Sequence, residues 1–355
     1  MATAMMTEAR RFIPERLQEF CTAVFMKAGA RPEDAAQMAR ALVFADLRGV
    51  DTHGLIRLPM YVRTLKSGGM DVRATVSVIR DQGPTALLDG HNGISYVSAG
   101  RAMELAIAKA REFGVGAVGL RNAGHIGALA FFSTYALEHR MIGFAGSNTT
   151  PLLAPTGGTV PLLGHNPWSV AVPTGGDTPV VLDMANSTVA RGKIRLAAVK
   201  GEKIPLGWAF NKRGEPTTDP EEAMDGGFLT PMGGYKGYGI TLLISILCGL
   251  LTGARLDSEI PDLEAADRPK EMGQFFMALK IEAFVPFEEF SRRIREVIHA
   301  LRNSPKAAGV ERIYVPGEIE HRCAEERRRN GIPEHPNIVK AANEVARELG
   351  VPPLE

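Results

Sequence analysis

The stretch Gly114-Val115-Gly116-Ala117-Val118-Gly119 decides the fold, because it matches G-x-G-x-x-G in an unexpected context. In a Rossmann dinucleotide-binding motif such glycines follow a strand and open a helix, whose N-terminus then faces a pyrophosphate. Here Ser95 to Phe113 has the pattern of a helix that Gly114 ends, and Val115 to Leu120 has the pattern of a strand. We therefore predict an α/β fold that lacks the Rossmann motif and has a strand packed tightly at these glycines.

Further strands and helices are expected on both sides of this unit. Two pairs of strands flank turn residues, one at Gly83-Pro84 and one at Thr174-Gly175-Gly176-Asp177. Hairpins and crossover connections in the same stretch predict a mixed sheet rather than a purely parallel one. The expected strands are Thr75 to Ile79, Thr85 to Leu88, Met141 to Ser147, Ser169 to Val172, Pro179 to Asp183 and Phe275 to Ile281, and the expected helices are Ala128 to His139 and the apolar run after Gly239.

The two ends of the chain have helical patterns. Pro32 stands near the start of one helix, and Pro59 precedes a short helix from Met60 to Lys66. From Pro286 onward the chain is again helical and charged, except at Ile313 to Val315 before Pro316-Gly317. We predict a helical N-terminal part at 1–74, an α/β domain at 75–285, and a C-terminal helical part at 286–355 that packs against the N-terminal part.

The composition is that of an ordinary globular protein. Of 355 residues, 45% are hydrophobic and 23% charged, and the formal net charge of +1 gives no electrostatic reason to expect nucleic acid or a membrane as partner. The apolar run Ile240 to Leu251 is too short to span a bilayer of about 30 Å, so we expect a buried helix.

No signal peptide is visible in Met1 to Glu19, which contains several charged residues. The three cysteines, Cys21, Cys248 and Cys323, are far apart and odd in number. This pattern is typical of reduced, buried thiols in a cytoplasmic protein, and it indicates neither a disulfide framework nor a metal site.

The most informative segment for chemistry is Arg48-Gly49-Val50-Asp51-Thr52-His53-Gly54-Leu55-Ile56-Arg57, with Tyr61 just beyond it. Histidine can transfer a proton near neutral pH, and arginine binds a carboxylate through two parallel hydrogen bonds. A proton donor flanked by carboxylate-binding groups would suit the reduction of a 2-oxo acid. The alternative is a surface helix with salt-bridged arginines and a histidine that has no catalytic role.

Four other segments carry candidate binding residues. His125, in Asn122-Ala123-Gly124-His125-Ile126-Gly127, follows a strand and so lies where α/β sheets commonly bind ligands, although an ordinary helix entry would read similarly. The strand Val180-Val181-Leu182 ends in Asp183. The segment from Gly233 to Gly239, which we expect immediately before a helix, contains Lys236 and could bind a pyrophosphate, or could be a plain glycine-rich turn. Val315-Pro316-Gly317-Glu318 is a rigid turn beside a carboxylate.

Taken together, these segments resemble the type 2 malate/L-lactate dehydrogenase family, and the resemblance covers nearly the whole chain. That family includes malate, sulfolactate and ureidoglycolate dehydrogenases, a diketogulonate reductase and cyclic-imine reductases. The matching stretches are Asp46 through Arg57, Gly124-His125-Ile126-Gly127, Gly164-His165-Asn166-Pro167, Leu182-Asp183-Met184-Ala185, Ala190-Arg191-Gly192-Lys193, Pro205-Leu206-Gly207-Trp208, Pro216-Thr217-Thr218-Asp219-Pro220, Gly234 to Gly239 and Pro316-Gly317-Glu318.

The resemblance implies a nicotinamide-binding domain with a mixed sheet and homodimers whose sites lie near the subunit contact. His53 matches the proton donor, and His125 matches the residue with that role in some members. Substrate-binding residues implied in this way are Arg48, Thr52, Arg57, Tyr61, Asn148 and His165, and cofactor-binding residues are His125, Ile126, Gly127, Asp183, Met184, Ala185, Tyr235, Lys236, Pro316, Gly317 and Glu318.

Two residues depart from the family pattern. Thr52 stands where serine is usual, and His165 stands where Thr-Asn-Pro is usual, so a titratable ring would reshape the site. Imine reductases of the family tend to carry an acid near the position of Lys193, and its absence here favours 2-oxo and 2-hydroxy acids.

We therefore predict a cytoplasmic oxidoreductase that transfers a hydride between NAD or NADP and a small 2-hydroxy or 2-oxo carboxylic acid. A reductase of cyclic imines or ketimines, or a non-catalytic nucleotide-binding homologue, remains an alternative. A hydrolase built on Asp51, Thr52 and His53 is disfavoured, because the side chains of adjacent residues diverge and no G-x-S-x-G segment is present.

Overall fold

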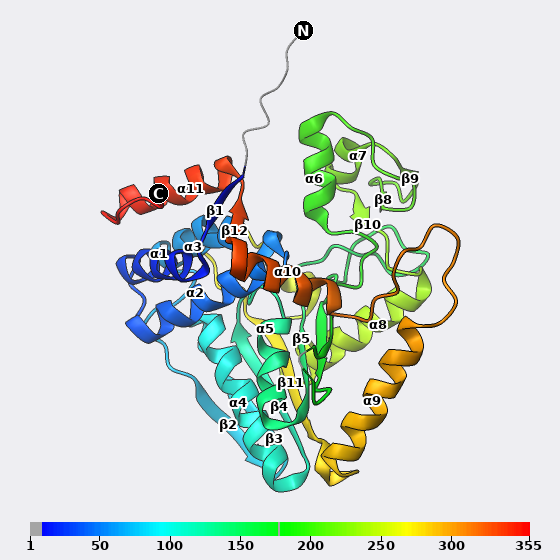
Figure 1. The fold of residues 1–355 in the computed structure, drawn as a ribbon. Coiled ribbons are helices and arrows are strands. Elements are labelled where there is room, and N and C mark those ends of the chain that lie inside the picture. Colours follow the sequence, from blue (N-terminus) through cyan, green and yellow to red (C-terminus); the bar gives the residue numbers. More distant parts are fainter. Residues whose placement is uncertain (1–8, 177) are drawn as a thin grey trace.

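The computed structural model describes residues 9–176 and 178–355. The first eight residues of the expected N-terminal part and of the segment searched for a signal peptide lie outside this range, as does Asp177 of the predicted turn. The two ends of the described chain lie side by side, and the α/β part extends away from them (Figure 1).

A seven-stranded sheet forms the centre of the molecule. Only β3 and β4 are parallel to each other among the paired neighbours of this sheet in the described residues, and the other pairs are antiparallel. The predicted mixed sheet is thus confirmed. The strand order is β2 (Ser77–Gln82), β3 (Thr85–Asp89), β4 (Val115–Ala123), β11 (Met272–Lys280), β5 (Met141–Ser147), β6 (Trp168–Val172) and β7 (Val180–Met184).

The glycines that matched G-x-G-x-x-G follow a helix and open a strand, as predicted. Helix α4 (Ser95–Phe113) ends at Gly114, which adopts a left-handed conformation with φ of 82°, and β4 begins at the next residue. A Cβ atom on Gly116 would lie 2.0 Å from the carbonyl oxygen of Ala106, so glycine here permits close packing of α4 on the sheet. Helices α4 and α5 (Ala130–Ser133) cover one face of the sheet.

The opposite face is covered by α8 (Tyr235–Ser245) and the π-helical turn that continues it (Ile246–Leu250). Two expectations for this segment were wrong. The helix begins at Tyr235, so most of the glycine-rich segment lies within it rather than before it. The apolar run is not buried throughout, since Leu243, Leu250 and Leu251 are 55%, 60% and 62% exposed. A run that is apolar on every side cannot place all its side chains against one sheet.

Segments from both ends of the chain pack together. Strand β1 (Arg10–Phe12) pairs with β12 (Ile332–Glu334), and neither strand was predicted. One hydrophobic core runs from the terminal helices to the sheet, through Leu17, Leu42, Phe276 and Leu354 among others. The helices are α1 (Pro14–Lys27), α2 (Pro32–Leu47), α3 (Leu58–Lys66), α9 (Phe287–Arg302), α10 (Glu318–Asn330) and α11 (Pro336–Glu348).

A small unit with its own core, which the sequence did not predict, stands beside the main body (Figure 1). Its strands are only two residues long, too short for a periodic pattern to reveal them. It contains α6 (Arg191–Lys200), α7 (Pro220–Met224) and the sheet β10-β8-β9, formed by Phe228–Leu229, Ala209–Phe210 and Pro216–Thr217.

The remaining elements are short 3-10 turns. The expected helix Ala128 to His139 is divided between α5 and the turn Thr134–His139. Among the described helices, none combines the length and apolar character that crossing a membrane requires. The other 3-10 turns are Asp51–His53, Leu55–Arg57, Asp257–Glu259 and Ile281–Ala283.

Candidate functional site

Two consecutive 3-10 turns between α2 and α3 carry His53 and Arg57. The side chain of Arg57 folds back over the first turn, and its Nε donates a hydrogen bond of 2.8 Å to the carbonyl oxygen of Thr52. The hydroxyl of Thr52 lies 3.0 Å from Nδ1 of His53. The backbone and side chain of Thr52 therefore hold the guanidinium and the imidazole at the same end of this segment.

His125 lies against His53, although 72 positions separate them in the sequence. The two rings stack with centroids 5.6 Å apart and planes inclined by 19°. The hydroxyl of Tyr61 lies 2.6 Å from Nδ1 of His125 and 2.9 Å from the hydroxyl of Tyr96. Since each imidazole uses Nδ1 in these contacts, and no described residue bonds either Nε2, the Nε2 atoms are available to a ligand.

His165 completes a group of three imidazoles, with its Nδ1 3.2 Å from the hydroxyl of Thr149. Burial, together with the charge of Arg57 and the proximity of His165, lowers the pKa of His53 to about 4. Burial also lowers the pKa of His165 to about 4 and that of His125 well below its usual value. All three side chains nevertheless keep some solvent exposure. We call this group of His53, His125, His165 and Arg57 the imidazole recess.

Arg57 is the cation of the recess, and it forms no ion pair with any carboxylate of the described residues. The guanidinium is partly buried beside three rings that are neutral at pH 7. A partly desolvated charge is costly unless an opposite charge accompanies it. The recess is therefore electrostatically suited to a small anion.

Arg48 is the residue predicted to flank His53 as a second clamp. Its guanidinium is stacked 5.3 Å from the centre of the Phe44 ring. Burial lowers its pKa, while the carboxylates of Glu320 and Asp183 oppose that shift. The two arginines, nine positions apart, thus face different charges, since Arg48 has Glu320 and Asp183 nearby and Arg57 has no ion pair among the described residues.

Asp183 is the centre of a second group. Its Oδ2 accepts a 2.7 Å hydrogen bond from the backbone N–H of Ala130 at the start of α5. Desolvation by the surrounding protein raises the pKa of Asp183 to about 6, although the N–H of Ala130 and the charge of Arg48 oppose the shift. The carboxylate remains exposed to solvent, and Met184 and Ala185 beside it are partly buried. We call Arg48, Asp183, Met184 and Ala185, with the neighbouring Pro316-Gly317 turn, the Asp183 rim.

The Pro316-Gly317 turn lies directly against β7. The carbonyl oxygen of Pro316 accepts a 3.0 Å hydrogen bond from the N–H of Val181, and a Cβ atom on Gly317 would lie 2.8 Å from that nitrogen. Glu318, in contrast, is 2% exposed and forms ion pairs with Arg302, at 2.9 Å, and Arg312. Burial raises its pKa, but the two arginines hold it below its ordinary value. Its carboxylate is thus already engaged within the protein.

Tyr235 and Lys236 occupy the exposed first turn of α8, after Gly234 with φ of 66°. This turn is tied to the chain that follows β7, since the N–H of Met232 donates a 2.8 Å hydrogen bond to the carbonyl oxygen of Asn186. The exposed N-terminus of the helix therefore lies in a segment connected to the Asp183 rim.

Three other predicted residues have structural roles in the fold. Asn148 is fully buried, donating to the carbonyl oxygen of Arg255 and accepting from the N–H of Gly273, both at 2.9 Å. Ile126 is 2% exposed. Gly127 has φ of 67°, and a Cβ atom there would lie 2.4 Å from the hydroxyl of Tyr96. Ile126 and Gly127 thus hold the segment that carries His125.

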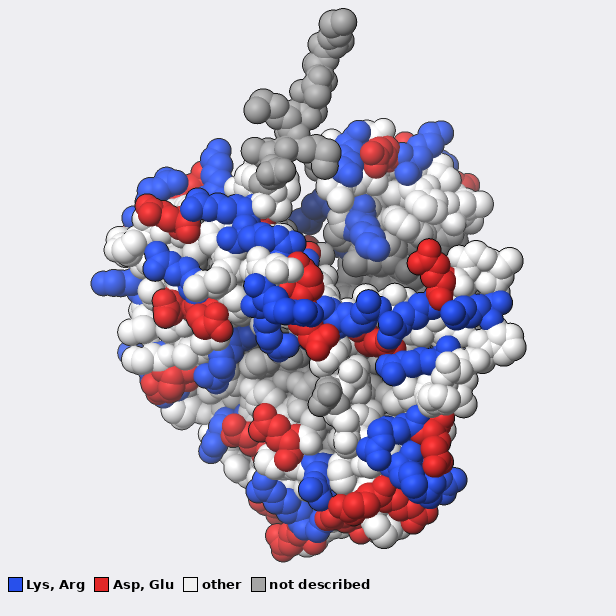
Figure 2. Space-filling view, viewed as in Figure 1, with Lys and Arg blue, Asp and Glu red and all other residues white. Residues whose placement is uncertain are grey.

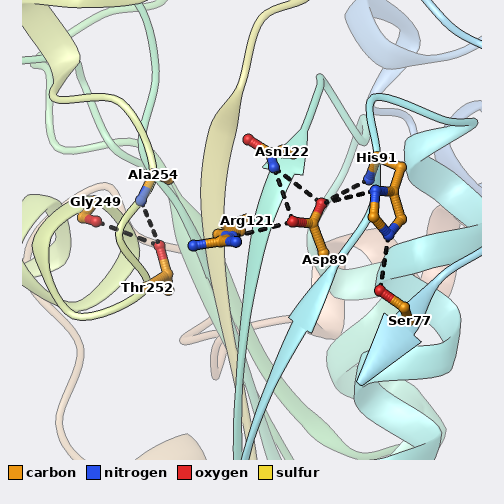
Figure 3. A network of polar contacts seen from close by, with 8 residues as sticks. All are labelled: Ser77, Asp89, His91, Arg121, Asn122, Gly249, Thr252 and Ala254. Atoms are coloured by element: carbon orange, nitrogen blue, oxygen red, sulfur yellow. Dashed lines mark hydrogen bonds and ion pairs between the residues drawn. The ribbon is translucent and has the colours of Figure 1, made fainter. Parts of the chain in front are cut away.

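A polar network that the sequence analysis missed fixes the end of β4 (Figure 3). Asp89 accepts hydrogen bonds from Asn122 Nδ2, at 2.9 and 3.0 Å, and from Arg121 Nε at 3.1 Å. Asn122 has φ of 51°, a left-handed conformation that asparagine tolerates. Two residues later, the N–H of Gly124 donates to Ser95 Oγ at 2.6 Å. A signal was available in the sequence, since Asp89 and Arg121-Asn122 directly follow the expected strands Thr85 to Leu88 and Val115 to Leu120.

Basic side chains form a band across one face of the molecule over α10 (Figure 2). This helix carries Arg322, Arg327, Arg328 and Arg329. Arg328 is near enough to Arg48 to lower its pKa further. The band therefore adds positive charge beside the Asp183 rim, although the whole chain is close to neutral.

Comparison with known proteins gives a consistent result. The family model described as malate/L-lactate dehydrogenase matches residues 12–342. The chain is 41% identical to a malate dehydrogenase of Pyrococcus abyssi, over 97% of this chain and 96% of that protein. It is 38% identical to an L-sulfolactate dehydrogenase of Methanocaldococcus jannaschii, over 95% and 97% respectively. The solved structure of a malate dehydrogenase from Pyrococcus horikoshii superimposes with a TM-score of 0.90 and 38% identity, over 98% of this chain and 97% of that one.

Proposed function

The chain belongs to the malate/L-lactate dehydrogenase family, and on that premise we propose how its two groups of residues divide the reaction. It is an oxidoreductase that transfers a hydride between a nicotinamide cofactor and a small 2-hydroxy or 2-oxo carboxylic acid. We propose that the imidazole recess binds and protonates the acid and that the Asp183 rim binds the cofactor.

The observation that carries the proposal is the position of Arg57, a partly buried guanidinium beside His53 with no carboxylate partner among the described residues. Its Nε is engaged by Thr52, and one terminal nitrogen makes only a long 3.9 Å contact with Sδ of Met60, a weak acceptor that a substrate carboxylate would displace. A bidentate pair fixes the acid in one orientation, and such alignment can lower a barrier by several kcal/mol. The carbonyl next to that carboxylate then lies within reach of the imidazoles.

His53 is the proposed proton donor, and His125 is its partner. The contact with Thr52 orients the ring of His53 and leaves Nε2 directed to the substrate. His53 is neutral before substrate binds, and the negative charge of a bound carboxylate would raise its pKa and favour proton uptake. Tyr61 holds His125 through Nδ1, so that its Nε2 can donate a hydrogen bond to the same substrate oxygen.

The residues of the rim fit a nicotinamide dinucleotide, which supplies and accepts the hydride when bound. The exposed N-terminus of α8 with Lys236, and Arg48 with the basic band of α10, would compensate phosphate charges. The exposed carboxylate of Asp183 can accept hydrogen bonds from ribose hydroxyls above its pKa of about 6. We assign cofactor contacts to Ile126, Gly127, Asp183, Met184, Ala185, Tyr235, Lys236, Pro316 and Gly317, with Glu318 anchoring that turn, and the cofactor is NAD or NADP.

The division into residues 1–74, 75–285 and 286–355 is part of the same proposal, with the cofactor bound chiefly by the middle part. We also propose that the chain forms a homodimer in the cytoplasm. Exposed apolar side chains of α8 and the π-helical turn, such as Leu243, Leu250 and Leu251, would be covered in a dimer. The buried thiols of Cys21 and Cys248 are compatible with a reducing compartment.

The function is tested by following absorbance of the reduced nicotinamide, with each cofactor, against malate, lactate, sulfolactate and ureidoglycolate and their 2-oxo forms. We expect turnover of at least one acid and a rise in KM when its carboxylate is replaced by an amide. Reduction of cyclic imines without turnover of any 2-oxo acid would instead favour the imine reductase.

A further inference from the structure

A pair of buried carboxyl groups lies behind the imidazole recess. Asp46, in the last turn of α2, is 1% exposed, and Glu334, at the end of β12, is 3% exposed. The two side chains are within hydrogen-bonding reach of each other. Oε1 of Glu334 has no hydrogen-bond partner in the described residues. Because two ionised carboxylates cannot hydrogen-bond to each other, the contact requires a proton on one of them.

Asp46 is also in direct contact with the segment that follows His53. Its Oδ2 accepts a 2.8 Å hydrogen bond from the backbone N–H of Leu55. A Cβ atom on Gly54 would lie only 1.5 Å from Oδ1 of Asp46, so the carboxylate packs against the backbone where a side chain would otherwise stand. The two 3-10 turns that carry His53 and Arg57 meet at Gly54, and Asp46 is the side chain that fixes this junction.

Charged groups from other elements surround the pair. Arg327 of α10 donates to the backbone carbonyl oxygen of Asp46 and forms an ion pair with Asp51, at the start of the first 3-10 turn. The thiol of Cys21, on α1, faces both carboxyl groups. Among these neighbours Arg327 is the only cation, and it is already paired with Asp51. The pair therefore lacks a counter-ion sufficient for two negative charges.

We propose that Asp46 and Glu334 are positioning residues that share one proton and, by holding the backbone at Gly54 and Leu55, keep His53 and Arg57 aligned in the recess. This inference rests on the proposed roles of His53 and Arg57. It adds that strand β12, far from the recess in sequence, takes part in holding the catalytic turn.

The proposal implies a dependence on pH that is separate from the titration of His53. Burial raises the pKa of both carboxyl groups above their ordinary range. The charge of Glu334 raises the pKa of Asp46 further, and the N–H of Leu55 opposes that shift. At Glu334 the hydrogen bond with Asp46 and the charge of Arg327 oppose the rise. The pair titrates as one unit. When it loses the shared proton, two adjacent buried charges repel each other, and we expect the junction at Gly54 to move and alignment in the recess to be lost.

The variant Glu334→Gln tests this, because an amide can donate a hydrogen bond to Asp46 without titrating. We expect kcat/KM of the variant to stay within about twofold of the wild type near pH 6 and to exceed it about threefold or more near pH 9, where the wild-type pair is ionised. Because His53 titrates in both proteins, dividing kcat/KM of the variant by kcat/KM of the wild type at each pH removes the contribution of His53. Cofactor affinity, measured by fluorescence titration, should be equal in both proteins. A constant ratio across this range would overturn the proposal.

Two further measurements do not depend on turnover. The wild type should show the infrared carbonyl band of a buried protonated carboxylic acid, and this band should disappear on raising the pH together with a change in the NMR signals of the His53 ring. Glu344→Gln, an exposed site on α11, is the matched control and should leave the band unchanged. A missing band, or a band that titrates without any change at His53, would overturn the proposal even if Glu334→Gln does not fold. Failure to turn over any acid, with both signals present, would instead count against the proposed function alone.

Discussion

The imidazole recess and the Asp183 rim are both partly desolvated, yet desolvation acts on them in opposite directions. In the recess it lowers the pKa of His53 and His165, so the rings are neutral at pH 7 and Arg57 provides the charge. At the rim it raises the pKa of Asp183, while Arg48 stands near two acids. The proposed substrate site thus holds a cation with no carboxylate partner among the described residues, whereas the proposed cofactor site holds a cation beside two carboxylates.

The largest expected effect concerns the recess. His53→Ala should lower kcat by about 10² or more, the usual scale for loss of a general acid, and leave cofactor affinity unchanged. Stopped-flow reduction and a fluorescence titration of the cofactor measure the two quantities. His299→Ala, an exposed histidine of α9, is the control. Near-normal turnover of His53→Ala would transfer the proton-donor role to His125.

The two arginines provide the next test. Arg57→Lys should raise the KM of the acid about tenfold, since an ammonium cannot reproduce the two parallel hydrogen bonds. Arg48→Lys should weaken cofactor binding and change the KM of the acid less than Arg57→Lys does. Steady-state kinetics with each substrate varied in turn separates these outcomes. If Arg48→Lys and Arg57→Lys raise the KM of the acid equally, the recess and the rim are not distinct sites.

The smallest effects concern stability and pH, and they should have opposite signs. The folded pKa of His165, about 4, is below its unfolded value near 6.5, so stability is lost as pH falls through this window. His165→Gln should reduce that loss by about 1–2 kcal/mol, discounted for partial exposure. The folded pKa of Asp183, about 6, is above its unfolded value, so stability is lost as pH rises from about 4 to 6.

The free energy of unfolding of Asp183→Asn, relative to that of the wild type, should therefore be higher near pH 7 than at pH 4. This difference should be smaller than the one expected for His165→Gln, because the Asp183 carboxylate is exposed. Urea unfolding of both variants at the two pH values gives the comparison. If the free energy of unfolding changes with pH in the same way in the wild type and in one of the variants, desolvation does not control the pKa of the residue replaced in that variant.

Much of the architecture was predictable from local patterns. The helix before Gly114 and the strand after it were predicted with the right boundary at Gly114, since a glycine in left-handed conformation leaves a clear mark at a helix end. The mixed sheet followed from turn residues between short apolar strands. The start of α8 was predicted too late, after Gly239 rather than at Tyr235, because its first turn contains glycines, which helices usually avoid.

For the candidate site, the sequence indicated the chemistry of His53, His125 and Arg57 but not which groups would meet. It suggested one clamp of Arg48 and Arg57, whereas these arginines lie in different electrostatic environments. It also offered Asn148 and Glu318 as ligand contacts, and both side chains are engaged within the protein. Hydrogen-bond partners distant in sequence decide whether a polar side chain is free.

By itself the sequence determined the strands of the central sheet, the main helices beside them and the absence of a strand-to-helix turn at the G-x-G-x-x-G match, since these depend on neighbours along the chain. Only the tertiary structure decided that His53 stacks on His125, that Arg57 lacks an acid among the described residues while Arg48 faces Asp183, and that Glu334 reaches Asp46. Burial and electrostatic interactions depend on distances in space. Folding brings together residues that are far apart in the sequence, and their separation along the chain does not give the distance between them in the folded protein.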